Sequence, residues 1–233
     1  MRVAIIPARG GSKRIPRKNI RQFCGKPMIA WPIGAALESG IFDRVIVSTD
    51  DPEIASIAES AGAEAPFVRP PEFSDDHAGT SAVVAHAIDW LQQRGDAPDT
   101  VCCIYATAPF MAAADLRRGL DLLREEGAAF VFPVTTYAFP IQRAIRLTPN
   151  GRLEMFYPEQ YATRSQDLED AYHDAGQFYW GRADAWCSGA PVFGSYSVPL
   201  VIPRFRVQDI DIPEDWDRAE LMFSAVKHRE EAH

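Results

Sequence analysis

Short apolar runs and longer stretches of helical spacing alternate along most of the chain. The β-branched run at 3–6 predicts a buried strand that stops at Pro7. Similar apolar runs predict strands at 44–49, 101–105 and 129–134. Between them, apolar residues recur with helical spacing, which predicts helices at 27–39, 52–61, 80–93 and 115–126.

Capping signals support these helix boundaries. Asp50-Asp51-Pro52 combines a capping carboxylate with a proline suited to a first helical turn. Gly40, Gly62 and Gly127 each follow an expected helix, where a left-handed residue often ends it. The alternation of strands and helices implies an α/β fold, with a parallel sheet and helices on both faces. A chain of 233 residues with 47% hydrophobic content predicts a single domain, 1–233.

The alternation is interrupted between about residues 135 and 172. This segment has no clean period, and it contains several prolines and the aromatic residues Phe139, Phe156, Tyr157 and Tyr161. A long irregular insertion in a compact domain is more often functional or interfacial than idle. The alternative is a floppy excursion, which the aromatic residues disfavour.

The first predicted strand opens into a glycine-rich loop with many cations. Gly10 and Gly11 allow the backbone to take positive φ and to approach a ligand closely, and successive amides in such a turn can form an anion-binding nest. Six cations lie in or just beyond the loop: Arg9, Lys13, Arg14, Arg17, Lys18 and Arg21. In a chain of net charge −8, such a cluster suits a polyphosphate. The alternative is a solvated surface loop, and neither the P-loop nor the dinucleotide-binding pattern occurs here.

A second candidate site is the segment 206–213. Its alternation predicts a strand with Asp209 and Asp211 on one face and Ile210 and Ile212 on the other. Two carboxylates so placed suit Mg²⁺, which prefers oxygen ligands and shares its shell with substrate phosphate. The alternative is helix capping, because Asp211 lies just before the helix start at Pro213.

Composition excludes several other classes of protein. The acidic balance argues against a general nucleic-acid binder. The cysteines lack metal-ligand spacing, and Cys102 and Cys103 are expected to be small buried hydrophobes. The chain has neither a signal-peptide core nor 18 consecutive apolar residues. We therefore expect a cytoplasmic protein that binds neither nucleic acid nor a membrane.

Residues 6–20 resemble, almost position for position, the opening motif x-I-P-A-R-x-G-S-K-x-[IL]-x-x-K-N-[IL] of the CMP-sialic acid synthetase family. The resemblance covers essentially the whole chain. It implies a Rossmann-like nucleotidyltransferase sheet, CTP as co-substrate, Mg²⁺ as cofactor and a homodimer. It also implies that the insertion at about 135–172 is a dimerisation arm, exchanged between subunits, that contributes to the partner's sugar site.

The resemblance assigns Arg9 and Lys13 to catalysis on the triphosphate. It makes Asp209 and Asp211 catalytic metal ligands, which favours the metal over the cap. Arg69 matches the position that reads cytosine, while a capping role for Thr80 is equally natural and compatible with contact. The implied nucleotide-binding residues are Ala8, Gly10, Gly11, Ser12, Asn19, Arg69, Gly79, Thr80 and Ser81, the last three following Asp76-His77-Ala78.

Further matches imply a site for a sugar acid. Arg164 and Gln166 fit the R-x-Q-x-L motif, whose arginine approaches the sugar. Tyr105 and Ala175 stand where sialic acid enzymes usually carry Gln and Asn. The run 164–180 looks like the pseudaminic acid branch of the family. The implied sugar-binding residues are Tyr105, Arg164, Gln166, His173, Asp174 and Tyr179.

Together these matches imply nucleotidyl transfer. The anomeric hydroxyl of a nine-carbon 2-keto sugar acid would attack the α-phosphate of CTP and release pyrophosphate. Neuraminic, legionaminic and 3-deoxy-octulosonic acids are alternative substrates. A catalytically silent nucleotide-binding module is a further alternative, and the joint presence of Arg9, Lys13, Asp209 and Asp211 argues against it.

Overall fold

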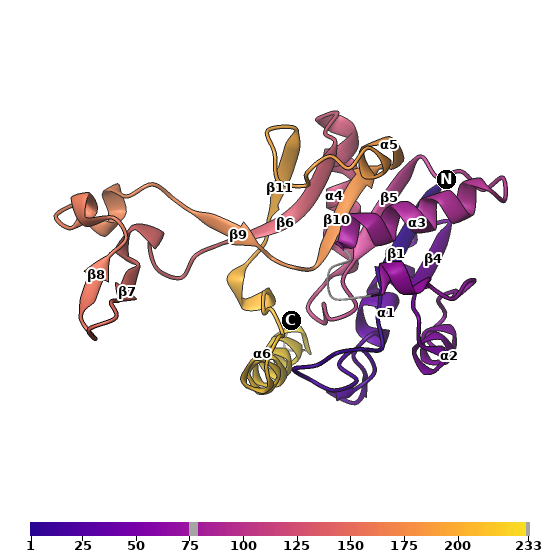
Figure 1. The fold of residues 1–233 in the computed structure, drawn as a ribbon, viewed down its shortest axis with the longest axis horizontal. Coiled ribbons are helices and arrows are strands. Elements are labelled where there is room, and N and C mark those ends of the chain that lie inside the picture. The colour runs from indigo at the N-terminus through magenta and orange to yellow at the C-terminus, as the bar shows by residue number, and fades with distance from the viewer. Residues whose placement is uncertain (75–78, 232–233) are drawn as a thin grey trace.

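The computed structural model describes residues 1–74 and 79–231, and its centre is a mixed β-sheet (Figure 1). Asp76, His77 and Ala78, which precede Gly79 in the matched segment, lie outside the described residues. The strands follow each other across the sheet in the order β11-β6-β10-β5-β1-β4, and β9 pairs with β6. Their bounds are β1 Arg2–Pro7, β4 Arg44–Ser48, β5 Thr100–Ile104, β6 Phe130–Thr136, β9 Tyr172–Asp174, β10 Phe178–Arg182 and β11 Ser197–Val201.

The sheet is mainly parallel, whereas the sequence predicted a parallel one. β1 runs parallel to β4 and β5, and β11 runs parallel to β6. β10 lies between β5 and β6 and is antiparallel to both. It follows the irregular insertion rather than a crossover helix, so the rule that makes βαβ units parallel does not apply to it.

Helices cover both faces of the sheet, as predicted. α1, α2 and α4 pack on one face, and α3 and α5 pack on the other (Figure 1). Buried β1 side chains alternate between these layers, with Ala4 and Ile6 in the first and Val3 and Ile5 in the second. The helix bounds are α1 Ala30–Ser39, α2 Pro52–Ser60, α3 Thr80–Gln92, α4 Ala113–Glu125, α5 Ala183–Cys187 and α6 Pro213–Glu231.

The predicted helix ends are largely confirmed. The Asp51 carboxylate accepts the N–H groups of Glu53 (2.9 Å) and Ile54 (3.1 Å), with Pro52 in the first turn of α2. Gly40 ends α1 with φ 66°, in the left-handed region. Thr80 does not cap α3, because Gly79 occupies the cap position and Thr80 is the first helical residue.

The predicted strand at 206–213 is wrong. Arg204–Arg206 form a short 3₁₀ turn, and the chain then runs irregularly to α6. Ile210 is buried in a small core with Phe23 and Trp216, whose rings meet edge to face at 5.4 Å between centroids, whereas Ile212 is 42% exposed. The apparent alternation therefore reflects one anchoring side chain, and this anchor joins α6 to the short β2–β3 hairpin (Gln22–Phe23, Lys26–Pro27).

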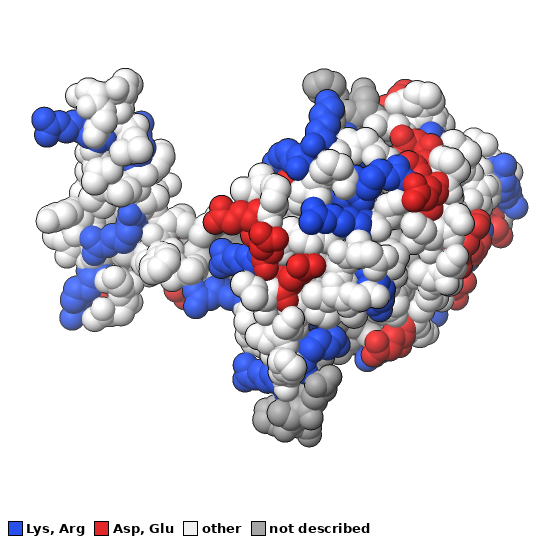
Figure 2. All heavy atoms as spheres, turned by 90° about the horizontal axis from the view of Figure 1, so that it is seen from below, with Lys and Arg blue, Asp and Glu red and all other residues white. Residues whose placement is uncertain are grey.

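The segment between β6 and β9 projects away from the body as an arm (Figure 1). It carries a hairpin of β7 (Ile145–Leu147) and β8 (Leu153–Met155) and three short 3₁₀ turns, at Ile141–Arg143, Pro158–Gln160 and Ser165–Asp167. Its visible face in Figure 2 is mostly uncharged. Large hydrophobic side chains are exposed along it, namely Tyr137, Phe139, Ile145, Leu147, Leu153, Phe156, Tyr157, Tyr161 and Tyr172.

Candidate active site

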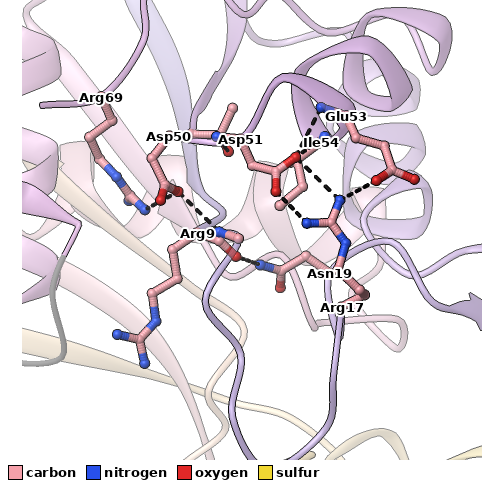
Figure 3. Close-up of polar contacts among 10 residues, drawn as sticks. Arg9, Arg17, Asn19, Asp50, Asp51, Glu53, Ile54 and Arg69 are labelled. Carbon is pink, nitrogen blue, oxygen red and sulfur yellow. Dashed lines mark hydrogen bonds and ion pairs between the residues drawn. The ribbon is translucent and has the colours of Figure 1, made fainter. Parts of the chain in front are cut away.

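The glycine-rich loop leaves β1 beside the turn that joins β4 to α2. The buried Ala8 donates its N–H to the Ser48 carbonyl at 2.9 Å, which extends the pairing of β1 with β4 by one residue. The Gly10 N–H donates to Asp50 Oδ1 at 3.0 Å. Asn19 Nδ2 donates to the Arg9 carbonyl at 3.0 Å (Figure 3). Three polar contacts thus fix the loop where the strand ends.

The left-handed backbone that glycine allows is not used at either loop glycine. Neither Gly10 nor Gly11 has positive φ. A Cβ on Gly10 would lie 2.6 Å from the Asp51 carboxylate, whereas one on Gly11 would meet open space. Gly10 is therefore required by a close approach to the neighbouring turn, and Gly11 has no such steric reason.

The loop forms one wall of a cavity of about 310 Å³. This cavity joins residues from the loop, from the start of α3, from the segment after β5 and from the approach to α6. Eight of the predicted site residues line it: Arg9, Ser12, Lys13, Asn19, Arg69, Thr80, Tyr105 and Asp211.

The six cations near the loop separate into two groups. Arg9, Lys13, Arg14 and Lys18 line the cavity. Arg17 instead forms ion pairs with Asp51 and Glu53 on α2 (Figure 3). The guanidinium of Arg21 lies over the Trp216 ring, 4.6 Å from its centroid.

Arg69 presents a buried positive charge at the cavity. Its side chain is 3% exposed, and Nε donates to Ser74 Oγ at 3.2 Å. Nη2 lies 3.7 Å from Asp50 Oδ1 and has no hydrogen-bond partner among the described residues. Burial lowers the pKa of Arg69, with Arg9 acting in the same direction and Asp50 opposing it. A buried donor left unsatisfied in this way is costly, and a ligand carbonyl would satisfy it.

The two aspartates before α6 are not equivalent. Asp211 lines the cavity, where its carboxylate lies 3.0 Å from Arg14 and 3.4 Å from Lys18. Lys18 also donates to the Ile210 carbonyl at 2.6 Å. Asp209 does not line the cavity, and its pKa is raised by burial and by the neighbouring Asp211 carboxylate, while Lys18 lowers it.

The capping alternative for Asp211 is not supported by these contacts. Asp215 accepts the N–H groups of Asp211 (3.0 Å) and Ile212 (2.9 Å), so that carboxylate serves the start of α6. The Asp211 carboxylate pairs with cations instead.

The two aspartate carboxylates could hold a hard divalent cation only if a bound ligand supplied further oxygen atoms. Within residues 1–74 and 79–231, the structure contains no group of three Asp, Glu, His or Cys side chains that could enclose a metal. Two carboxylates suit Mg²⁺, which completes its octahedral shell with water and phosphate oxygens.

Behind Tyr105 lies a chain of hydroxyl groups. Tyr179 is 4% exposed, its ring centroid lies 5.2 Å from that of Tyr105, and its hydroxyl donates to the Asp174 carboxylate. Burial raises the pKa of Tyr105, while hydrogen bonds with Tyr179 and Thr80 oppose this effect. His173 packs edge to face on Tyr137 at the base of the arm. Tyr105 thus lines the cavity and packs against Tyr179, which Asp174 holds in turn, whereas His173 contacts Tyr137.

The structure does not bring the remaining predicted residues to the cavity. Arg164 and Gln166 lie on the arm, where Arg164 pairs with Asp167 at 2.7 Å. The other predicted residues that do not line the cavity are Ala8, Gly10, Gly11, Gly79, Ser81, His173, Asp174, Tyr179 and Asp209.

Sequence reasoning also missed several residues. The sequence identifies Arg14 and Lys18 only as cations of the loop, and the structure shows that both contact Asp211. Asp50 was read only as part of a capping sequence, yet it contacts Gly10 and Arg69. Phe73 and Val83 line the cavity without any sequence signal that separates them from ordinary core or loop residues.

A family model described as Cytidylyltransferase matches residues 3–179. The chain belongs to the cytidylyltransferase family. It is an enzyme of the nucleotidyltransferase class, which confirms the predicted family. None of the helices in the described part of this cytidylyltransferase is long and apolar enough to cross a membrane.

Individual relatives narrow the comparison for this cytidylyltransferase. It is 47% identical over 226 residues to the pseudaminic acid cytidylyltransferase of Campylobacter jejuni serotype O:2, with 97% of each chain covered. It is 32% identical to the CMP-N,N'-diacetyllegionaminic acid synthase of Legionella pneumophila, covering 94% of this chain and 95% of that one. A solved CMP:2-keto-3-deoxy-manno-octonic acid synthetase, complexed with CTP, shares the fold at 17% identity, with a TM-score of 0.69 and 96% and 98% of the chains covered.

We predict that Arg9→Ala or Lys13→Ala lowers kcat/KM for CTP. The loss of a preorganised donor removes roughly 2–4 kcal/mol of transition-state stabilisation. Arg21→Ala is the matched control, because that cation lies over Trp216 rather than in the cavity. Steady-state kinetics at varied CTP would make the comparison. If all three variants show equally small decreases in kcat/KM, the cationic cluster is a solvated surface loop.

Proposed function

We propose that this enzyme transfers CMP from CTP to pseudaminic acid, a nine-carbon 2-keto sugar acid, and releases pyrophosphate. The observation that carries the proposal is 47% identity over 97% of the chain to an enzyme of that name. The cavity supports it, because a polyphosphate requires the gathered cations and a base requires a buried donor such as Arg69.

In the proposed complex, the triphosphate lies along Arg9, Ser12 and Lys13, and cytosine lies against Arg69. The arginine offers N–H donors that match the O2 and N3 acceptors of cytosine. Thr80 would lie near the ribose, at the start of α3. The chain would act mainly by positioning CTP and by compensating its charge as the α-phosphate is attacked.

Mg²⁺ is the proposed cofactor, held by Asp209 and Asp211. When bound, it would neutralise part of the triphosphate charge. Arg14 and Lys18 would orient the Asp211 carboxylate toward the cavity that all three line. Burial and the neighbouring Asp211 carboxylate raise the pKa of Asp209, and a bound cation would favour its charged form.

Sugar choice is proposed to depend on Tyr105 and the buried Ala175. The Tyr105 hydroxyl interacts with Tyr179 and Thr80, so it is already satisfied within the protein. Ala175 is 3% exposed and offers only a methyl group. Pseudaminic acid has a C9 methyl and a second acylamino group where neuraminic acid has hydroxyls, and the lack of free polar groups at these two positions favours the former.

The arm is proposed to act in a homodimer. Its large apolar side chains are exposed to solvent, which is unfavourable, and a second copy of the chain would cover them. Arg164 and Gln166, on the arm that projects from the body (Figure 1), would then reach the sugar site of the partner, which accounts for their absence from the cavity lining of their own chain.

The proposal includes a cytoplasmic location. The four cysteines, Cys24, Cys102, Cys103 and Cys187, are free thiols in the structure, as suits a reducing compartment. Neither nucleic acid nor a membrane is among the proposed partners.

The reaction is tested by incubating the protein with CTP, Mg²⁺ and a panel of sugar acids while pyrophosphate is followed. We expect kcat/KM to be higher for pseudaminic acid than for N-acetylneuraminic, legionaminic or 3-deoxy-octulosonic acid. A preference for another sugar would replace the proposed substrate and keep the reaction. No pyrophosphate with any sugar would favour a silent nucleotide-binding module.

Asp211→Ala is expected to abolish Mg²⁺-dependent turnover and to leave the protein folded, because the side chain pairs with cavity cations rather than with the amides of α6. Asp215→Ala is the contrasting variant. It removes the acceptor for two backbone N–H groups, so it should lower the melting temperature and leave the Mg²⁺ requirement unchanged. Near-normal turnover of Asp211→Ala at limiting Mg²⁺ would contradict the metal role.

The shared site is tested by mixing two impaired variants. Arg9→Ala removes a cavity residue, and Arg164→Ala removes an arm residue. If the arm serves the partner, mixed dimers contain one intact site, and the mixture turns over faster than either variant alone. Sedimentation should show a dimer for each variant. A dimeric mixture that is no faster than the two variants after subunit exchange would contradict the exchange of arms.

A further inference from the structure

Asp50 lies at the end of β4, on the turn that leads into α2. One carboxylate oxygen, Oδ1, accepts the Gly10 N–H at 3.0 Å and lies 3.7 Å from Arg69 Nη2 (Figure 3). Gly10 belongs to the loop proposed to hold the triphosphate, and Arg69 is the residue proposed to read the base. A single atom therefore connects the two halves of the nucleotide site.

We propose that Asp50 is a positioning residue that sets the phosphate loop and the base-reading arginine relative to one another. The inference rests on the proposed CTP site, and it adds a residue that neither the family motif nor the cavity lining includes. Asp50 does not line the cavity, so it acts through Gly10 and Arg69 rather than by touching the nucleotide.

The local charges explain why this position needs a carboxylate. Arg69 is 3% exposed, and Arg9 stands near enough to disfavour its charge. A buried cation without a nearby anion is strongly destabilised. Asp50 is the anion that favours the Arg69 charge, and its side chain is 34% exposed, so water still solvates part of it.

Helix capping does not account for Asp50. The cap of α2 is Asp51, whose carboxylate accepts two amides of the first turn and also pairs with Arg17. Asp51 further limits Gly10, because a Cβ there would lie 2.6 Å from its carboxylate. The two adjacent aspartates thus have separate tasks, with Asp51 serving the helix and Asp50 serving the loop and Arg69.

We expect Asp50 variants to be impaired in the use of CTP and not in the use of the sugar acid. Asp50→Ala should raise KM for CTP about tenfold, the effect of losing one charge-assisted hydrogen bond, while KM for the sugar acid changes less than twofold. Discrimination between CTP and UTP should also fall, because a mobile Arg69 no longer presents its donors in a fixed geometry to cytosine. Asp50→Asn keeps an acceptor for the Gly10 N–H but has no charge for Arg69. It should recover part of the CTP affinity without recovering the discrimination.

Asp43 provides a matched control at the opposite end of β1. Its carboxylate likewise accepts a backbone N–H, that of Arg2 at 2.6 Å, and lies 3.9 Å from the Arg2 guanidinium. Asp43→Ala and Asp43→Asn should leave both KM values and the CTP preference unchanged. Melting temperatures of all variants separate loss of folding from loss of positioning.

Two results would overturn the inference. In one, Asp50→Ala has the same CTP KM and CTP preference as Asp43→Ala. In the other, Asp50→Ala raises KM for CTP and for the sugar acid equally, as a general loss of structure would. Calorimetric titration with CTP alone keeps the test independent of turnover. If the parent binds CTP but activates no sugar acid, the proposed function fails, and the CTP affinities of the variants still decide the role of Asp50.

Discussion

The parallel pairing of β1 with β4 is the constraint on which the candidate site depends. Ile6 and Pro7 lie opposite Val47 and Ser48, and one further hydrogen bond joins Ala8 to Ser48. Both strands then end at the same edge of the sheet, so the loop after β1 meets the turn after β4. Ligands of open α/β sheets bind at this edge, and here the side chains of the turn hold the loop in place.

The charged side chains of this protein are unevenly distributed over its surface. The net charge is −8, yet five cations line one cavity, four from the loop region and Arg69. The other two cations near the loop are held by α2 carboxylates and by an aromatic ring. In Figure 2, basic and acidic side chains lie close together on the lower face of the body. Acidic groups outside the cavity can keep the molecule soluble while a polyanion is attracted to one place.

Local signals in the sequence were sufficient for much of the fold. The apolar run before Pro7 predicted β1, and Asp51-Pro52 and Gly40 predicted helix ends that the structure confirms. These features depend on backbone preferences within a few residues. The motif around Arg9 and Lys13 likewise predicted a loop that does line a cavity.

Features that depend on distant residues were missed or misread. The alternation at Ile210 and Ile212 looked like a strand, but only Ile210 is buried, against Phe23 and Trp216 from other segments. Gly10 is explained by Asp51, some 40 positions away, rather than by its own φ. The direction of β10 depends on the path of the arm before it, which carries no periodic signal.

The position of β10 has a consequence for how the chain is made. β6 pairs only with β9, β10 and β11 among the described strands, and all three follow it in the sequence. As the chain leaves the ribosome, β4, β1 and β5 can already pair, whereas β6 must wait until the whole arm has been synthesised. During that interval both edges of the apolar strand Phe130–Thr136 have no partner strand, a condition that invites pairing with other chains. Synthesis of the arm therefore delays folding, and the length of the arm sets how long β6 remains without partner strands.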